Sequence, residues 1–168
     1  AKLGQLGIEY TIVEKNKDVG GTWLENSYPG CGVDTPNHAY SLSFGQRYRW
    51  SRYFALRDEI QDYLKRCANE FSVRSHIRFQ TTLICARWIE SDQCWEAELE
   101  GPAGKDRFRS GFLVSAIGQF NQPRKPTIPG WESFQGDAFH SAHWPADLDV
   151  TNQRVSIIVT GNSGMQYD

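Results

Sequence analysis

Residues 156–166 read "SIIVTGNSGMQ" and carry the strongest indication of fold class in the chain. An apolar, β-branched run leads into a glycine-containing turn and then into the first residues of a helix, which is the order of a dinucleotide-binding βα unit. The spacing is that of G-x-G-x-x-G, with Val159 in place of the first glycine and with Gly161 and Gly164 as the other two. Because backbone amides at a helix N-terminus bind pyrophosphate, the stretch predicts a strand at 155–160 followed by a phosphate-binding turn.

The opposite end of the chain, "AKLGQLGIEYTIVEKN" at residues 1–16, predicts the end of a helix, Gly7 as its C-cap and an apolar strand at 8–14. An acid that closes the second strand of a Rossmann unit bonds a ribose, about 20 residues after the phosphate-binding turn. If Glu14 has this role, the phosphate-binding turn would lie about 20 residues earlier, before residue 1. A solvated strand end is the alternative role for Glu14. We expect a chain that is cut at both ends.

The residues between these ends predict one helix and an antiparallel meander. Residues 57–71 carry apolar side chains at helical spacing. Three alternating runs, at 76–90, 94–100 and 107–118, read as strands, and a proline-rich boundary follows at 121–130. The order of elements predicts an α/β nucleotide-binding protein with an inserted meander.

Composition excludes several classes of partner. The chain has 168 residues, of which 39% are hydrophobic and 23% charged, and a net charge of −2, so we expect no nucleic-acid or membrane-surface partner. No apolar run approaches the roughly 18 residues of a membrane span, and no signal-peptide pattern opens the chain. The four cysteines form no C-x-x-C pair, so we expect a reduced, cytoplasmic protein without a metal site.

Two loop motifs suggest ligand contact, each with a structural alternative. "DVGGTW" at residues 18–23 has paired glycines, which let a backbone approach a ligand closely, and a flat indole; a tight turn with a packed Trp23 is equally consistent. "YPGCGVDTPNHAY" at residues 28–40 holds Asp34 in a loop rich in glycine and proline, where an Asx-turn is the alternative role.

The linker sequence "FQGDAFHSAHWP", residues 134–145, matches F-x-G-x-x-x-H-x-x-x-W-P and resembles the signature of flavin-dependent Baeyer–Villiger monooxygenases. Related N-hydroxylating flavin monooxygenases carry a similar motif without the Trp-Pro ending. Residues 20–44 resemble the same family, and specifically its 4-hydroxyacetophenone monooxygenase branch. The resemblance covers residues 1–168. The matching signature residues are Phe134, Gly136, His140, Trp144 and Pro145.

This resemblance implies a flavoprotein with two Rossmann-like dinucleotide-binding domains and the antiparallel meander inserted in the FAD domain. Residues 1–130 would form a partial FAD-binding domain that lacks its first βα turn. Residues 131–150 would be the interdomain linker with the signature, and residues 151–168 would begin the NADPH-binding domain. His140 and Trp144 would couple cofactor binding to domain movement.

The resemblance also implies roles for individual residues. Glu14 would bond the adenosine ribose of FAD, Leu83 would meet the adenine through its backbone, and Asp34 would be the active-site aspartate that touches both cofactors. The residues along the flavin would be Thr22, Trp23, Leu24, Glu25 and Tyr40. The residues on the NADP side would be Gly32, Val33, Thr160, Gly161, Asn162, Ser163, Gly164, Met165 and Gln166. The family often has arginine at the position of Gly32.

The implied reaction is a Baeyer–Villiger oxidation of a ketone to an ester with one oxygen from O₂. NADPH would reduce FAD, and the resulting C4a-peroxyflavin would attack the ketone carbonyl. The family's active-site arginine and FAD phosphate turn would lie outside these residues, so we expect this piece alone to be inactive and to bind FAD poorly. An N- or S-oxygenating flavin monooxygenase and a non-catalytic dinucleotide-fold remnant are the alternatives. The ketone, the oligomeric state and, from these residues alone, the choice of NADPH over NADH stay open.

Overall fold

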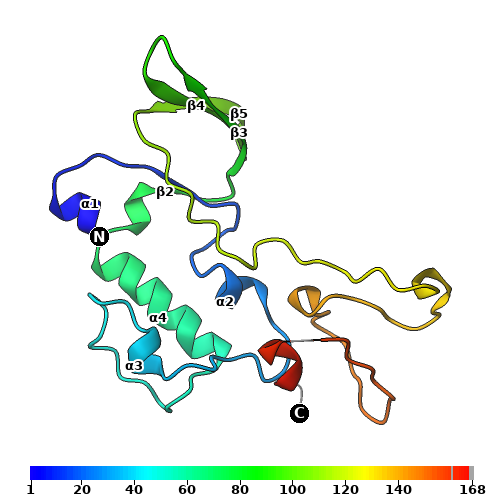
Figure 1. The fold of residues 1–168 in the computed structure, drawn as a ribbon. Helices are drawn as coiled ribbons and strands as arrows, with labels where there is room; N and C mark the ends of the chain where they lie inside the picture. The colour runs from blue at the N-terminus through cyan, green and yellow to red at the C-terminus, as the bar shows by residue number, and fades with distance from the viewer. Residues whose placement is uncertain (160, 167–168) are drawn as a thin grey trace. The chain divides into compact units, whose positions relative to one another are not determined.

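The computed structural model describes residues 1–159 and 161–166, which fall into two compact units (Figure 1). Unit 1 is made of residues 1–19 and 64–118, and unit 2 of residues 20–63 and 119–168. The predicted division at residues 130 and 150 stays a prediction.

Unit 1 begins with a short helix that ends in a glycine cap. Helix α1 spans Lys2–Gln5, and Gly7 follows it with a φ of 69°. The amide of Ile8 donates to the carbonyl of Leu3 (3.0 Å) and that of Gly7 to Gly4 (3.1 Å), the two bonds of a Schellman motif. The predicted C-cap at Gly7 is therefore confirmed.

A two-stranded parallel sheet follows, and it is shorter than predicted. Strand β1 spans Ile12–Val13 and pairs with β2, Ile77–Arg78. The predicted strand at 8–14 is wrong in extent, because β2 offers a partner only two residues long. Glu14 continues the pairing by one bond, from its amide to the carbonyl of Arg78 (3.0 Å).

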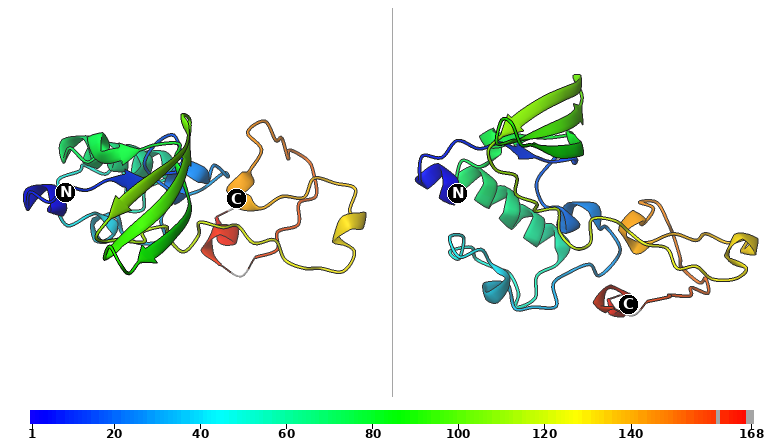
Figure 2. Two further views of the ribbon diagram at one scale, coloured as in Figure 1. Left: turned by 90° about the horizontal axis from the view of Figure 1, so that it is seen from above. Right: turned by 45° about the horizontal axis from the view of Figure 1, so that its top comes forward.

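The antiparallel meander is confirmed as three strands that lie side by side in one sheet (Figure 2). Its strands are β3 at Thr82–Ile89, β4 at Cys94–Gly101 and β5 at Gly104–Ser110. The inner positions Ala97 and Leu99 of β4 are buried.

Two boundaries of the meander differ from the prediction. The run at 76–90 divides into β2 and β3, because Gln80 adopts a φ of 51° and turns the chain. The run at 107–118 is a strand only as far as Ser110, which pairs with Trp95 near the start of β4. Residues 111–118 therefore lie past the end of their neighbour and pair with no other strand in the part of the chain that the structure describes.

Unit 2 holds two single-turn helices and the first half of a longer one. Helix α2 spans Thr22–Glu25, α3 spans Asn37–Tyr40, and α4 spans Arg57–Glu70, continuing into unit 1 after Tyr63. The predicted helix at 57–71 is confirmed. Tyr63, rather than the neighbouring Leu64, is its most buried large side chain after Ile60.

The packing around Tyr63 organises the loop that precedes α4. The Tyr63 hydroxyl accepts a hydrogen bond from the amide of Leu42 (2.7 Å). The rings of Tyr48 and Trp50 pack on the Tyr63 ring with centroids 5.2 and 4.9 Å away. Offset and edge-on aromatic contacts of this kind stabilise beyond their buried area.

The described residues of the linker and of the C-terminal part, 119–159 and 161–166, are irregular apart from three 3₁₀ turns. These turns are η2 at Trp131–Ser133, η3 at Ser141–His143 and η4 at Asn162–Met165. The predicted strand at 155–160 is wrong for residues 155–159, which pair with no strand among the described residues; Thr160 lies outside them. A parallel strand forms only against a neighbour, and an apolar sequence cannot replace one. No described helix is long and apolar enough to cross a bilayer.

Candidate functional site

Helix α2 coincides with the four consecutive residues, 22–25, that are predicted to lie along a flavin. It follows two glycines with left-handed φ values, 129° at Gly20 and 51° at Gly21, a conformation that other residues rarely adopt. A Cβ on Gly20 would overlap the side chain of Gln61, whereas a Cβ on Gly21 would meet no atom within 4 Å. Gly20 therefore lets the chain pack closely, and the backbone at Gly21 is open to a ligand.

The structure brings together two of the predicted flavin-side residues, Trp23 of α2 and Tyr40 of α3. The indole Nε1 of Trp23 donates a hydrogen bond to the Tyr40 hydroxyl (2.9 Å). Their rings meet edge to face, with centroids 5.8 Å apart and an interplanar angle of 88°. The pair presents a partly exposed aromatic surface.

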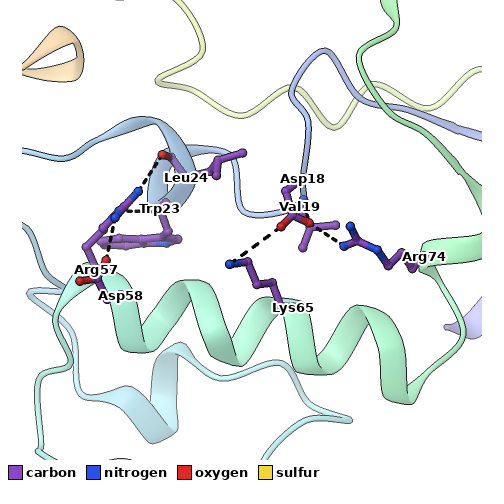
Figure 3. Close-up of polar contacts among 8 residues, drawn as sticks. All are labelled: Asp18, Val19, Trp23, Leu24, Arg57, Asp58, Lys65 and Arg74. Atoms are coloured by element: carbon purple, nitrogen blue, oxygen red, sulfur yellow. Dashed lines mark hydrogen bonds and ion pairs between the residues drawn. The ribbon is translucent and has the colours of Figure 1, made fainter. Parts of the chain in front are cut away.

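The backbone of α2 is held by Arg57, the first residue of α4 (Figure 3). The guanidinium donates from Nε to the carbonyl of Trp23 (2.9 Å) and from Nη2 to the carbonyl of Leu24 (3.0 Å). Its Nη1 pairs with Asp58 (2.7 Å). The sequence pattern does not single out Arg57, because an arginine at the start of an amphipathic helix normally points to solvent.

The loop with Gly32, Val33 and Asp34 lies against the segment that leads into α4. Gly32 forms a β-bridge with Leu56, and the amide of Val33 donates to the carbonyl of Ala55 (3.0 Å). A Cβ on Gly32 would lie 2.8 Å from that Ala55 oxygen, so the close approach of the two backbones requires glycine there. Val33 is buried, whereas Asp34 is exposed and accepts a hydrogen bond from the Thr35 hydroxyl (3.3 Å).

A buried amide, Asn37, fixes the same region. Its Nδ2 donates to the carbonyl of Arg52 (2.7 Å), and its Oδ1 accepts from the amide of Ala55 (2.8 Å). Asn37 is 3% exposed, and Ala55 is fully buried. Asn37 opens α3 and therefore links the position of Tyr40 to the 52–55 segment. The sequence analysis does not select Asn37, because its role depends on the backbone of residues 52–55 and not on its own neighbours in the sequence.

The structure also brings Gln166 to Gly32, two residues predicted on the NADP side. The Gln166 Nε2 donates to the carbonyl of Gly32 (3.0 Å), and its Oε1 accepts from the Tyr28 hydroxyl (2.9 Å). Gly30 has a φ of 76°, and a Cβ there would overlap the Gln166 carbonyl oxygen. Gln166, near the end of the sequence, therefore lies against the loop that holds Gly30 and Gly32.

The remaining predicted NADP-side residues lie on the last turn. Gly161 directly precedes η4, which holds Asn162, Ser163, Gly164 and Met165. A Cβ on Gly164 would overlap the Val159 side chain, so this glycine packs the turn against the preceding segment. Thr160 lies outside the described residues.

Unit 1 carries the two predicted residues for the adenosine half of FAD. One carboxylate oxygen of Glu14, which follows β1, accepts a hydrogen bond from the amide of Asn16 (2.8 Å). Leu83 lies in β3 at an irregularity in the pairing with β4 and is 43% exposed. Both residues are at least partly exposed. No hydrogen bond joins Glu14 and Leu83 among the described residues.

Asp18, at the start of the "DVGGTW" motif, forms a charged cluster in unit 1 (Figure 3). Arg74 donates to its carboxylate (2.6 Å), Lys65 lies 3.9 Å away, and the Val19 amide donates as well (2.9 Å). Partial burial raises the pKa of Asp18, but the hydrogen bonds from Arg74 and Val19 and the two positive charges outweigh it and lower the pKa below 3.8.

Several residues of the signature segment make local contacts with one another or with their neighbours. A Cβ on Gly136 would lie 2.7 Å from the ring of Phe134, which covers this position. His140 caps η3, because its Nδ1 accepts from the amide of Ala142 (3.1 Å). The Trp144 ring, next to Pro145, meets Phe139 edge to face at 5.3 Å.

Burial is the main cause that lowers the pKa of His140 below 6.5, and the positive charges of His143 and Lys125 add to it. Burial also raises the pKa of the Cys31 thiol above 9.0, so Cys31 is not an activated nucleophile. Cys31, Cys67, Cys85 and Cys94 form no disulfide among the described residues. Within residues 1–159 and 161–166 no three His, Cys, Asp or Glu side chains gather as metal ligands do.

Comparison with known proteins identifies the family. The model of the family described as "Flavin-binding monooxygenase-like" matches residues 39–167. A Baeyer–Villiger monooxygenase of Streptomyces coelicolor is 39% identical over 166 residues, which are 98% of this chain and 31% of the relative.

Two solved structures resemble the chain over 98% of its length. The crystal structure of OTEMO in complex with FAD and NADP is 38% identical, with a TM-score of 0.86, and 32% of it is covered. Cyclohexanone monooxygenase from Rhodococcus sp. Phi1, bound to NADP⁺, is 32% identical, with a TM-score of 0.84, and 31% of it is covered.

These likenesses confirm the α/β fold class and the resemblance to Baeyer–Villiger monooxygenases, whereas the 4-hydroxyacetophenone branch stays a prediction. The chain spans about a third of the length of the relatives that it matches. The chain belongs to the flavin-binding monooxygenase-like family.

Proposed function

We propose that the protein containing this chain is an FAD- and NADPH-dependent Baeyer–Villiger monooxygenase that converts a ketone to an ester with one oxygen from O₂. The observation that carries the proposal is the match of 98% of the chain to a structure in complex with FAD and NADP. The full F-x-G-x-x-x-H-x-x-x-W-P signature at 134–145 favours the Baeyer–Villiger branch over N-hydroxylating relatives.

The residues proposed for FAD have the chemistry that the cofactor requires. One oxygen of Glu14 accepts the Asn16 amide, and the other accepts no hydrogen bond among the described residues, which suits a ribose hydroxyl. The backbone at Gly21 is open, and the Trp23 and Tyr40 rings offer apolar surface for a flat ring system. Thr22, Leu24 and Glu25 share α2 with Trp23, and Leu83 would meet the adenine.

The residues proposed for NADPH come from two segments. Gly32 and Val33 lie beside Asp34 in one loop, and Gln166 reaches the Gly32 carbonyl from the last turn. Residues 160–166, around this turn, would receive the pyrophosphate. Asp34 is exposed and carries a carboxylate that can accept hydrogen bonds from a bound cofactor.

When bound, reduced FAD supplies the activation of O₂ and NADPH supplies the hydride that reduces FAD. The protein's own residues position these groups and exclude water from them. Trp23 and Tyr40 hold each other through a hydrogen bond and an edge-to-face contact, which keeps their ring surface in one orientation. His140 and Trp144 of the signature would couple cofactor binding to domain movement. We also propose a reduced, cytoplasmic location, which suits four cysteines that form no disulfide among the described residues.

The test is product analysis on the full-length protein. The purified enzyme is given NADPH, air and either a ketone, an amine or a sulfide, with reactions lacking NADPH as the control. An ester as the main product supports the proposal. An N- or S-oxide as the main product would instead place the protein in the alternative class, and a protein without bound flavin or NADPH oxidation would be a non-catalytic remnant.

A further inference from the structure

We infer that Arg57 is a positioning residue of the FAD site. By holding the backbone of α2, its guanidinium fixes the segment that the proposed function places along the flavin. The inference rests on that proposed function and adds to it a residue that contacts neither cofactor nor substrate in the proposal.

The first argument comes from the hydrogen bonds of α2. A four-residue helix has too few internal bonds to persist alone, and no backbone amide among the described residues donates to the carbonyls of Trp23 or Leu24. Arg57 supplies donors to two of them, at Trp23 (2.9 Å) and Leu24 (3.0 Å). Its positive charge also lies at the negative end of the helix, where a cation is favourable.

The second argument is that Arg57 is itself anchored on the other predicted cofactor segment. Its backbone amide donates to the carbonyl of Cys31 (2.8 Å), one residue before Gly32. Arg57 therefore connects the 31–34 loop, through its backbone, to α2, through its side chain. Its side chain is 29% exposed, and Nη1 is further restrained by Asp58 at 2.7 Å.

The third argument is geometric. The planar guanidinium presents its donors in a fixed fork, so Nε and Nη2 set the spacing of two consecutive carbonyls. Trp23, whose carbonyl is held, directs its indole Nε1 to the Tyr40 hydroxyl (2.9 Å). Loss of the fork frees the α2 backbone and, with it, the orientation of the Trp23 and Tyr40 rings.

The experiment uses the full-length protein with FAD as the probe. Arg57→Ala removes the guanidinium fork, and Arg57→Lys keeps the charge without the fork. Arg66→Ala is the matched control, because Arg66 is an exposed arginine on the same helix and pairs with Glu70. The readouts are the FAD dissociation constant, the visible circular dichroism of the bound flavin, and amide hydrogen exchange across α2. Melting temperature is measured in parallel.

The expected results separate the variants. Arg57→Ala raises the FAD dissociation constant at least about tenfold, because two charge-assisted hydrogen bonds are lost. It also alters the flavin dichroism and speeds exchange at Glu25 and Asn26, whose amides donate to the carbonyls of Gly21 and Thr22. Arg57→Lys restores part of the affinity, and Arg66→Ala changes the dissociation constant less than about twofold.

Three outcomes would count against the inference. If the wild type binds FAD and Arg57→Ala binds it with the same affinity and dichroism, Arg57 has no positioning role, while the proposed function stands. If Arg57→Ala speeds exchange throughout the protein and Arg57→Lys restores nothing, Arg57 only supports the fold. If the wild type itself binds no FAD, the proposed function fails and the inference falls with it.

Discussion

Replacing Asn37 with alanine removes the buried amide that holds the 52–55 segment. The variant loses the hydrogen bond to the Arg52 carbonyl (2.7 Å) and the one from the Ala55 amide (2.8 Å). Each such bond contributes about 1 kcal/mol net, and leaving the fully buried Ala55 amide without an acceptor costs a further ~1 kcal/mol or more. We expect the free energy of unfolding to fall by about 3 kcal/mol.

Urea unfolding of the wild type and of Asn37→Ala measures this difference, and amide exchange at Ala55 shows where it arises. The control is Asn69→Ala, at an exposed position near the end of α4. Because alanine is the better helix former, this control should change stability by less than about 0.7 kcal/mol, toward greater stability.

Two results together would refute the reasoning about Asn37. One is a stability of Asn37→Ala within about 0.5 kcal/mol of the wild type, the range of an ordinary surface substitution. The other is an Ala55 amide that stays as protected as before. In that case the side chain of Asn37 would not be what positions α3 and Tyr40.

Three further predictions concern local conformation and charge. Gly30→Ala should destabilise the protein by about 1 kcal/mol or more, because Gly30 has a φ of 76° and a Cβ would overlap a backbone carbonyl; a melting temperature equal to the wild type would contradict this. Asp18 has a lowered pKa, so its contribution to stability is present above pH 3.8 and is lost as the pH falls through the folded pKa. The stability difference between wild type and Asp18→Asn should therefore shrink in acid, and a difference that does not depend on pH would exclude the ion pair with Arg74 as its source. His140 has a pKa below 6.5, so its stabilising neutral form is lost only as the pH falls through that lower value. An NMR titration of the His140 imidazole should therefore have its midpoint below pH 6.5. A midpoint above 6.5 would contradict the cap that its Nδ1 forms with the amide of Ala142.

The elements that could be predicted from the sequence depend on local signals. The helix at 57–70 has an apolar face at helical spacing, and Gly7 adopts the φ that a helix cap requires. In the meander, buried and exposed side chains alternate over Ala97–Glu100 of β4. These features need no information about distant residues.

The strand predictions that were wrong concern residues whose pairing depends on a distant part of the chain. A local sequence pattern gives no information about such a partner. Residues 111–118 and 155–159 are largely apolar and residues 8–11 hold Ile8 and Tyr10, yet each stretch lacks a neighbouring strand among the described residues. An apolar run is compatible with a strand, but the backbone hydrogen bonds that make one come from elsewhere in the chain.

In the candidate site, too, local features could be predicted and contacts between distant segments could not. The motif at 18–23 predicts a turn with close backbone approach, and the structure has Gly20, Gly21 and α2 there. Arg57 and Asn37 act through backbone carbonyls and amides of other segments, so their residue types carry no signal of that role. Only coordinates reveal such side-chain to backbone contacts.

The proposed oxygenation is tested most directly with labelled oxygen. The full-length protein is incubated with FAD, NADPH, a ketone and ¹⁸O₂, and the product is analysed by mass spectrometry. The account predicts an ester that carries one labelled oxygen, formed only when NADPH is present. An ester without label would contradict the account. So would a protein that oxidises NADPH but leaves every tested ketone unchanged and forms a labelled N-oxide from an amine.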